Sequence, residues 1–140
     1  MNKVLVDTNV LVYALDADSM YFQASQIFLL DTSNQLFTTS KNIAEFLSVV
    51  TRFPNRISIE QALIAVNDFT RFIQIIFPDN HSFAVFQKLL IGYKTSGLMI
   101  HDMEIASIAL SNNIVQIATF NKKDFAHVKE LQLIDLLKPL

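Results

Sequence analysis

The chain has 140 residues, of which 51% are hydrophobic and 17% are charged, and it contains 2 Gly, 3 Pro and no Cys. This balance excludes a disordered chain, a disulfide framework and a thiolate metal site, and it predicts one folded domain over residues 1–140. The formal net charge of −2 taken alone argues against a nucleic-acid partner, because phosphates attract cations.

Short apolar runs and helical patterns alternate along the whole chain. The predicted strands are residues 4–6, 35–39, 74–78, 112–120 and 131–137. The predicted helices are one that ends at Leu15 and residues 22–30, 40–53, 58–73, 80–95 and 102–112, followed by a short helix or turn at 122–131. Thr8 or Asn9 is predicted to cap the first of these helices, and Pro54 to stop the helix at 40–53. Strands that alternate with helices predict a parallel sheet covered on both faces.

No segment resembles a targeting or membrane-spanning sequence. The first apolar run, residues 3–15, is interrupted by Asp7 and lacks a cleavage pattern. No apolar stretch reaches the roughly 18 residues of a membrane span. We therefore expect a soluble, cytoplasmic protein without a membrane partner.

A carboxylate at the end of the first predicted strand marks a candidate site. Asp7 follows the apolar run Val4–Val6 directly, although an unpartnered charge in an apolar setting is costly. In parallel sheets, ligands bind beyond the carboxyl ends of the strands, where the strand order switches. The topology therefore predicts that Asp7 lies at a binding site.

Four of the 13 acidic residues lie outside plainly polar contexts. They are Asp7, Glu45, Asp102 and Asp124. Clustered carboxylates repel one another, and a hard divalent cation such as Mg²⁺ or Mn²⁺ removes that conflict. Because one or two such ions activate water for phosphodiester hydrolysis, and because no His or Cys ligand pair accompanies the acids, the set predicts metal-dependent hydrolysis of phosphodiesters.

Each acid also has a purely structural interpretation when it is taken alone. Asp7 and Asp102 could be helix N-caps, and Asp124 could be an acid in a first helical turn. Glu45 could lie on a solvated stripe or form a capping box with Asn42. The functional prediction therefore rests on the four acids together, in their order and spacing.

Four segments carry a resemblance to a known family. They are "VLVDTNVLVYAL", "SKNIAEFLSVVTR", "HDMEIASIALSNNI" and "IATFNKKDF". In this order they resemble the four signature blocks of PIN-domain nucleases, and the group that they resemble within that family is the VapC-type toxins of toxin–antitoxin pairs. The resemblance implies an α/β fold, a three-layer α/β/α sandwich around a mostly parallel sheet of about five strands.

The resemblance also implies roles for individual residues. Asp7, Glu45, Asp102 and Asp124 match the four acids of a pocket that holds Mg²⁺ or Mn²⁺. Asn9 matches the polar residue beside the first acid, Thr119 and Asn121 match polar positions near the fourth, and Thr8 is added to these supporting residues. The extra acid Glu104 is expected at the surface.

Basic residues near these segments are candidates for RNA-phosphate contacts. When the four site acids are left out of the count, nine acidic and 11 basic residues remain, and the net charge of the remainder is +2. The candidates are Lys41, Arg52, Lys122 and Lys123. Such contacts position a strand without reading its sequence, although simple solvation of these side chains stays open as the alternative.

The expected function is a metal-dependent endoribonuclease that acts as the toxin of a type II toxin–antitoxin pair. The expected partners are RNA, a small cognate antitoxin and a second copy of the chain, because helices carrying Phe22, Phe69 and Phe72 have surplus apolar surface. The alternative is a catalytically silent RNA-binding or scaffolding module. A haloacid-dehalogenase-type phosphatase would need a second Asp at position 9, where this chain has Asn.

Overall fold

The computed structural model describes residues 1–52 and 56–137. Its five strands are β1 (Asn2–Val6), β2 (Asn34–Thr39), β3 (Ile73–Ile76), β4 (Gln116–Ala118) and β5 (Gln132–Ile134). Its helices are α1 (Thr8–Tyr13), α2 (Phe22–Leu30), α3 (Ser40–Val50), α4 (Ile59–Phe69), α5 (Asn80–Gly92), α6 (Met99–Ser111) and α7 (Lys122–Phe125).

The five strands form one sheet in the order β3-β2-β1-β4-β5, and every neighbouring pair is parallel. The first strand therefore lies in the middle, with β2 on one side and β4 on the other. The strand order switches at β1, which is where α/β sheets bind ligands. The predicted parallel sheet of about five strands is confirmed.

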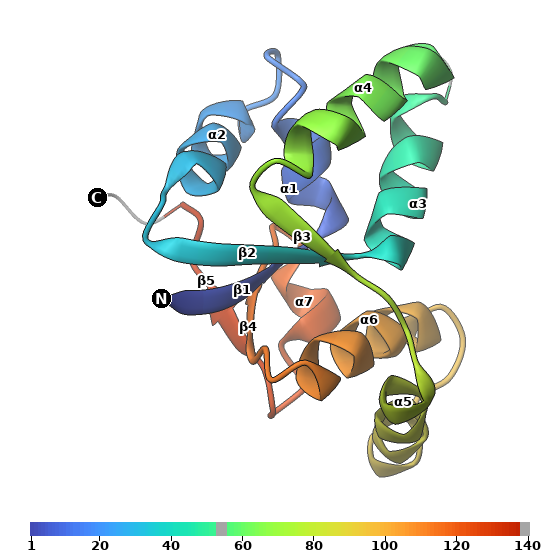
Figure 1. Ribbon diagram of the computed structural model, residues 1–140. Coiled ribbons are helices and arrows are strands. Elements are labelled where there is room, and N and C mark those ends of the chain that lie inside the picture. Colours follow the sequence, from blue (N-terminus) through green and yellow to red (C-terminus); the bar gives the residue numbers. More distant parts are fainter. Residues whose placement is uncertain (53–55, 138–140) are drawn as a thin grey trace.

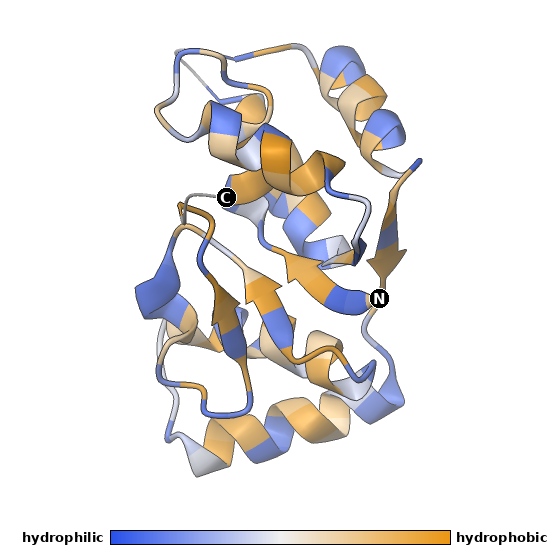
Figure 2. Ribbon diagram, turned by 90° about the vertical axis from the view of Figure 1, so that its left-hand side faces the viewer, coloured by the Kyte–Doolittle hydropathy of each residue, from blue (hydrophilic) through white to orange (hydrophobic). Residues whose placement is uncertain are grey.

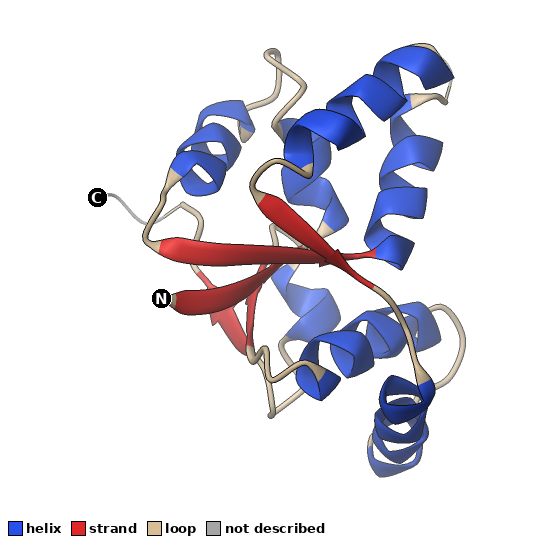
Figure 3. Ribbon diagram, in the orientation of Figure 1, coloured by secondary structure: helices blue, strands red, loops and turns tan. Residues whose placement is uncertain are grey.

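Helices cover both faces of this sheet, as Figures 1 and 3 show: α1 to α4 lie on one side, and α5, α6 and α7 on the other. Alternate residues of β1 point to opposite faces. Val4 and Val6 pack with Phe46 of α3 in one buried cluster, while Leu5 packs with Met103 of α6 in the other. This arrangement is the predicted three-layer sandwich.

Figure 2 shows hydrophobic residues along the strands of the sheet, which lies between the two helical layers. The β1 strand begins with exposed Asn2 and Lys3 and continues into three residues that are completely buried. Within residues 1–52 and 56–137, no helix combines the length and the apolar character that crossing a membrane requires.

Several predicted element boundaries were wrong. The helix predicted to start at residue 102 begins at Met99, and Ile73, predicted as the end of a helix, opens β3. The helix predicted for 40–53 ends at Val50, and the proposed stop at Pro54 lies outside the described residues. The strand predicted for 112–120 is limited to Gln116–Ala118.

Local capping explains where two of the helices begin. Ser58 and Gln61 form the predicted capping box of α4, in which each side chain bonds the backbone of the other. A second capping box, between Thr39 and Asn42, opens α3 directly after β2. The capping pair predicted for Glu45 and Asn42 is therefore wrong.

Candidate functional site

Asp7 lies at the junction between the central strand and the first helix. Its backbone N–H donates to the carbonyl oxygen of Ala118 at 3.0 Å, which joins the end of β1 to the end of β4. Asp7 is also the N-cap of α1, so the prediction that Thr8 or Asn9 caps this helix was wrong. The structural interpretation of Asp7 is thus correct, and it does not exclude a functional one.

Four donors surround the carboxylate of Asp7, which is only 7% exposed. Oδ1 accepts hydrogen bonds from the backbone N–H of Thr8 at 2.9 Å and from Nδ2 of Asn42 at 3.1 Å. Oδ2 accepts from Oγ1 of Thr119 at 2.7 Å and from Nδ2 of Asn9 at 3.3 Å. A buried carboxylate with this many donors is held in one orientation.

Burial and neighbouring charge make two of the carboxyl groups reluctant to ionise. Burial raises the pKa of Asp7, and the negative charges of Glu45 and Asp124 raise it further, against the hydrogen bonds that lower it. Burial also raises the pKa of Asp102 to about 6, with further contributions from Asp124, Asp7 and Glu45. The four predicted acids therefore interact electrostatically across a single site.

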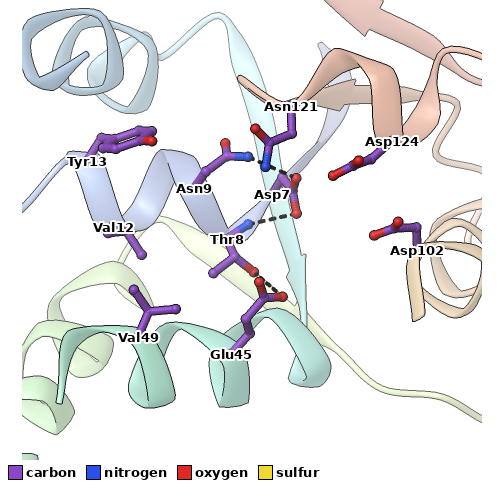
Figure 4. Close-up of a pocket in the computed structure, with 10 residues that line it drawn as sticks. All are labelled: Asp7, Thr8, Asn9, Val12, Tyr13, Glu45, Val49, Asp102, Asn121 and Asp124. Atoms are coloured by element: carbon purple, nitrogen blue, oxygen red, sulfur yellow. Dashed lines mark hydrogen bonds between the residues drawn. The ribbon is translucent and has the colours of Figure 1, made fainter. Parts of the chain in front are cut away.

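These acids line one pocket of about 280 Å³ at the carboxyl ends of the strands. Its lining residues are Asp7, Thr8, Asn9, Val12, Tyr13, Glu45, Val49, Asp102, Asn121 and Asp124. In Figure 4, the carboxylates of Asp102 and Asp124 point toward Asp7 from one side, and Glu45 lies on the other side, next to Thr8. The sequence had singled out seven of the ten residues.

Each of the other three acids is supplied by a different helix. Glu45 projects from α3, and one of its carboxylate oxygens accepts from Oγ1 of Thr8 at 3.3 Å. Asp102 lies in the first turn of α6, whose N-cap is Leu98, so the interpretation of Asp102 as an N-cap is wrong. Asp124 lies in the first turn of α7.

Thr119 is completely buried and bonds the first acid of the pocket. Besides donating to Asp7, its Oγ1 accepts from Nδ2 of Asn9 and from the backbone N–H of Asn121, both at 3.0 Å. The side-chain oxygen of Asn9 accepts from the backbone N–H of Phe120 at 3.0 Å. These bonds join α1 to the segment after β4, and Asn9 and Asn121, which take part in them, line the pocket.

Asn42 is a supporting residue that the sequence reasoning missed. It is completely buried, and its amide nitrogen donates to both Asp7 and Oγ1 of Thr8. The sequence did contain one sign of its role, because Thr39 and Asn42 have the spacing of a capping box. The sequence reasoning also missed Val12, Tyr13 and Val49, because apolar and aromatic residues in a helix are first assigned to the hydrophobic core.

The basic residues proposed for phosphate contacts differ in how far they are already paired. Nζ of Lys41 lies 2.9 Å from Oε1 of Glu104, and Nζ of Lys122 lies 3.5 Å from Oδ1 of Asp135. Arg52 and Lys123 are exposed. Glu104 is therefore not a free surface acid, and Lys41 already has an anionic partner on α6.

The carboxylate oxygens of the pocket are the kind of ligand that a hard divalent cation prefers. All four charged groups are carboxylates, and after burial the charges of Asp124, Asp7 and Glu45 raise the pKa of Asp102, so a cation among the four acids would relieve their repulsion. Among the described residues, no three acidic, His or Cys side chains form a compact metal cage. Mg²⁺ keeps several waters and binds through one or two carboxylates, so an open arrangement of acids suits a hydrated ion.

Comparison with solved structures relates the fold to bacterial toxin–antitoxin complexes. A chain of VapBC-1 from nontypeable Haemophilus influenzae is 23% identical with a TM-score of 0.72, and the match covers 97% of this chain and 99% of that one. A chain of VapBC2 from Rickettsia felis, bound to a DNA fragment from its promoter, is 23% identical with a TM-score of 0.70, covering 94% and 97%. The toxin VapC20 from Mycobacterium tuberculosis, described as cleaving the sarcin–ricin loop, is 11% identical with a TM-score of 0.69, covering 89% and 95%.

These likenesses establish the fold, and a sequence comparison establishes the family. No curated protein matches the chain. The sequence profile of the PIN domain matches residues 4–131, which include all four acids of the pocket. The chain therefore belongs to the PIN domain family.

Proposed function

We propose that this PIN domain is a Mg²⁺- or Mn²⁺-dependent endoribonuclease that hydrolyses RNA phosphodiester bonds. The observation that carries the proposal is the pocket in which Asp7, Glu45, Asp102 and Asp124 meet at the switch in strand order. Four acids in one pocket would repel a phosphate unless a cation lay between them. The single nuclease domain over residues 1–140 is part of this proposal.

The same four acids would hold the metal. A divalent ion bound there supplies a positive charge for the phosphate oxygens and lowers the pKa of a coordinated water. The chain itself supplies the orientation: Asn9, Asn42 and Thr119 fix the carboxylate of Asp7. Among the described residues, no Ser, Cys or His lines the pocket, and we propose direct attack by water without a covalent enzyme intermediate.

The biological role that we propose is the toxin of a type II toxin–antitoxin pair. The support is the similarity in fold to chains of VapBC-1, of VapBC2 and of a toxin–antitoxin complex from Klebsiella pneumoniae. A small cognate antitoxin is the proposed protein partner, and the cytoplasm, where RNA targets are found, is the proposed location.

We also propose a homodimer, built on the exposed apolar residues of α4 and of the segment after it. Phe69 is buried in the core and offers no surface, whereas Phe72 is 44% exposed. The outer side of α4 adds Ile59, Leu63 and Ile64, which are 47%, 46% and 61% exposed. Exposed apolar side chains that gather on one helix can form an interaction site, and light scattering on the purified protein tests the proposed dimer.

The decisive experiment measures cleavage of a mixed RNA pool by the purified protein with Mn²⁺, with Mg²⁺ and with EDTA. Asp7→Asn keeps the shape of the side chain and removes its charge, and Asp68→Asn is the matched control because Asp68 is exposed on α4. We expect cleavage that needs both a divalent ion and Asp7, with Asp68→Asn fully active. RNA binding without cleavage in either metal, from folded protein, would instead identify the silent binding module.

A further inference from the structure

The pocket has an apolar end that the metal chemistry does not use. Val12 and Tyr13 of α1 and Val49 of α3 line it, beside the acidic end. Figure 4 shows Val12 and Val49 facing each other between the two helices, and the ring of Tyr13 on the other side of α1 in this view, level with Asn9. An ion needs oxygen ligands, so the side chains of Val12 and Val49 take no part in holding a metal.

The ring of Tyr13 is fixed by two aromatic neighbours. Its centroid lies 5.1 Å from that of Tyr21 and 5.5 Å from that of Phe120, and the latter two rings stack on each other at 4.5 Å. Aromatic contacts in this range stabilise a defined ring orientation. Tyr13 also follows Asn9 by one helical turn, so the two side chains lie on the same side of α1.

The hydroxyl of Tyr13 has no hydrogen-bond partner among residues 1–52 and 56–137. None of the hydrogen bonds formed among the described residues involves it, and Figure 4 shows it directed from the ring toward the pocket. A phenolic hydroxyl both donates and accepts hydrogen bonds. The polar end of an otherwise packed ring is thus presented to whatever enters the pocket.

We propose that this apolar end is a subsite for the nucleobase next to the scissile phosphate, and that Tyr13 is its hydrogen-bonding residue. The inference rests on the proposed function, since it places the phosphate at the acids. The base lies against Val12 and Val49, and its polar edge meets the Tyr13 hydroxyl. Apolar side chains commonly hold an extruded base in this way, and the pocket volume of about 280 Å³ suits one nucleotide rather than a duplex.

The subsite defines the substrate class more narrowly. A base can enter it only when that base is unpaired, so the substrate is single-stranded RNA or a loop. The fixed position of the hydroxyl gives the subsite a preference among bases, because a base that places no donor or acceptor at that position leaves the hydrogen bond unmade.

The test follows nucleotide binding at the tyrosine rings by NMR, which needs no catalysis. The chain has 3 Tyr, and Tyr93 serves as the internal reference because its hydroxyl is already bonded to Glu130 and to the N–H of Lys129. The probes are the four ribonucleoside 5′-monophosphates and ribose 5-phosphate, each with Mg²⁺. We expect at least one nucleotide to shift the Tyr13 resonances and leave Tyr93 unchanged, with about tenfold tighter binding than ribose 5-phosphate.

A matched pair of variants isolates the hydroxyl. Tyr13→Phe keeps the ring and is expected to weaken the preferred nucleotide about fivefold and to flatten the preference among the four bases. Tyr93→Phe removes a hydroxyl far from the pocket and is expected to retain native affinity and preference. Equal binding of ribose 5-phosphate, or an unchanged base preference in Tyr13→Phe, would overturn the subsite.

The outcomes for the subsite and for the nuclease are separable. Nucleotide-dependent shifts at Tyr13 in a protein that cleaves no RNA would support the subsite and refute the proposed activity. Metal-dependent RNA cleavage whose cut-site preference is the same in Tyr13→Phe as in the native protein would support the nuclease and refute the subsite.

Discussion

The side-chain nitrogen of Asn42 donates a hydrogen bond of 3.1 Å to Oδ1 of Asp7, while the side-chain oxygen of Asn42 closes the capping box of α3 with Thr39. One buried amide therefore joins the start of α3 to the first acid of the pocket. Because Glu45 lies one turn further along the same helix, the capping box also determines where that acid stands.

Asn42→Ala is expected to affect both stability and activity. It removes a helix cap and a bond to a buried carboxylate, which together are worth about 2 kcal/mol. The matched control is Gln61→Ala, which removes the corresponding capping residue of α4 at an exposed position and should cost about 0.5–1 kcal/mol. Urea unfolding measures the stability, and we expect RNA cleavage to fall about tenfold in Asn42→Ala only. An equal loss of stability in both variants would show that the bond to Asp7 contributes nothing.

Asp102 should make the metal-free protein less stable as the pH rises. Burial, followed by the charges of Asp124, Asp7 and Glu45, raises its pKa from 3.8 to about 6. A carboxyl group whose pKa is higher in the folded state binds its proton more tightly there, so its contribution is complete below pH 3.8 and is lost as the pH rises through 6.

The corresponding variant is Asp102→Asn. In EDTA, its unfolding free energy should exceed that of the native protein by about 1–2 kcal/mol more at pH 7.5 than at pH 4, after allowance for solvent screening. Urea unfolding at the two pH values provides the measurement. A difference between variant and native protein that does not change with pH would contradict the raised pKa.

Divalent ions should stabilise the folded chain through the same acids. Mn²⁺ or Mg²⁺ at about 100 times its Kd adds about 2.7 kcal/mol to the free energy of unfolding, because the unfolded chain does not assemble the site. Thermal unfolding with and without the ion measures this, and Asp7→Asn should remove most of the increase while Asp68→Asn keeps it. An identical rise in Tm for the native protein and Asp7→Asn would exclude Asp7 from the metal site.

Lys123 is expected to contribute to RNA affinity, because it is exposed on α7 next to Asp124. Lys123→Ala in an Asp7→Asn background, which prevents cleavage, should weaken RNA binding a few-fold at low salt and reduce the salt dependence by about one ion. Lys88→Ala on α5 is the control, since Lys88 is exposed but does not belong to the pocket segments. Equal effects of the two substitutions would indicate that the charge acts nonspecifically.

The paired lysine Lys41 gives a different expectation. Its ion pair with Glu104 joins α3, which carries Glu45, to α6, which carries Asp102. Both side chains are about one-third exposed, so the pair contributes no more than about 1 kcal/mol to stability. Exchanging the two charges, in Lys41→Glu with Glu104→Lys, should restore the cleavage that either single substitution reduces. Failure of the exchange to restore cleavage would show that the ion pair does not position the acids.

The sequence by itself determined the features that depend on local spacing. The alternation of strands and helices predicted the parallel sheet, and the spacing of Ser58 and Gln61 predicted a capping box that the structure contains. Asp7 was identified as a site residue because it ends an apolar strand, and that position is fixed by hydrophobic periodicity and the rules of parallel sheets. Boundaries such as the start of α6 were less well determined, since Met99 and Ile100 fit either a strand or a helix.

Only the tertiary structure decided which side chains meet. Asn42 and Thr119 bond Asp7 across 35 and 112 positions of the chain, and Lys41 is paired with Glu104 across 63. These contacts depend on the placement of β4 beside β1 and of α6 near α3, which spacing along the chain does not specify. The same reason applies to Tyr13: helical periodicity assigns it to a packed surface, and the packing of α1 beside the segment after β4 leaves its hydroxyl facing the pocket.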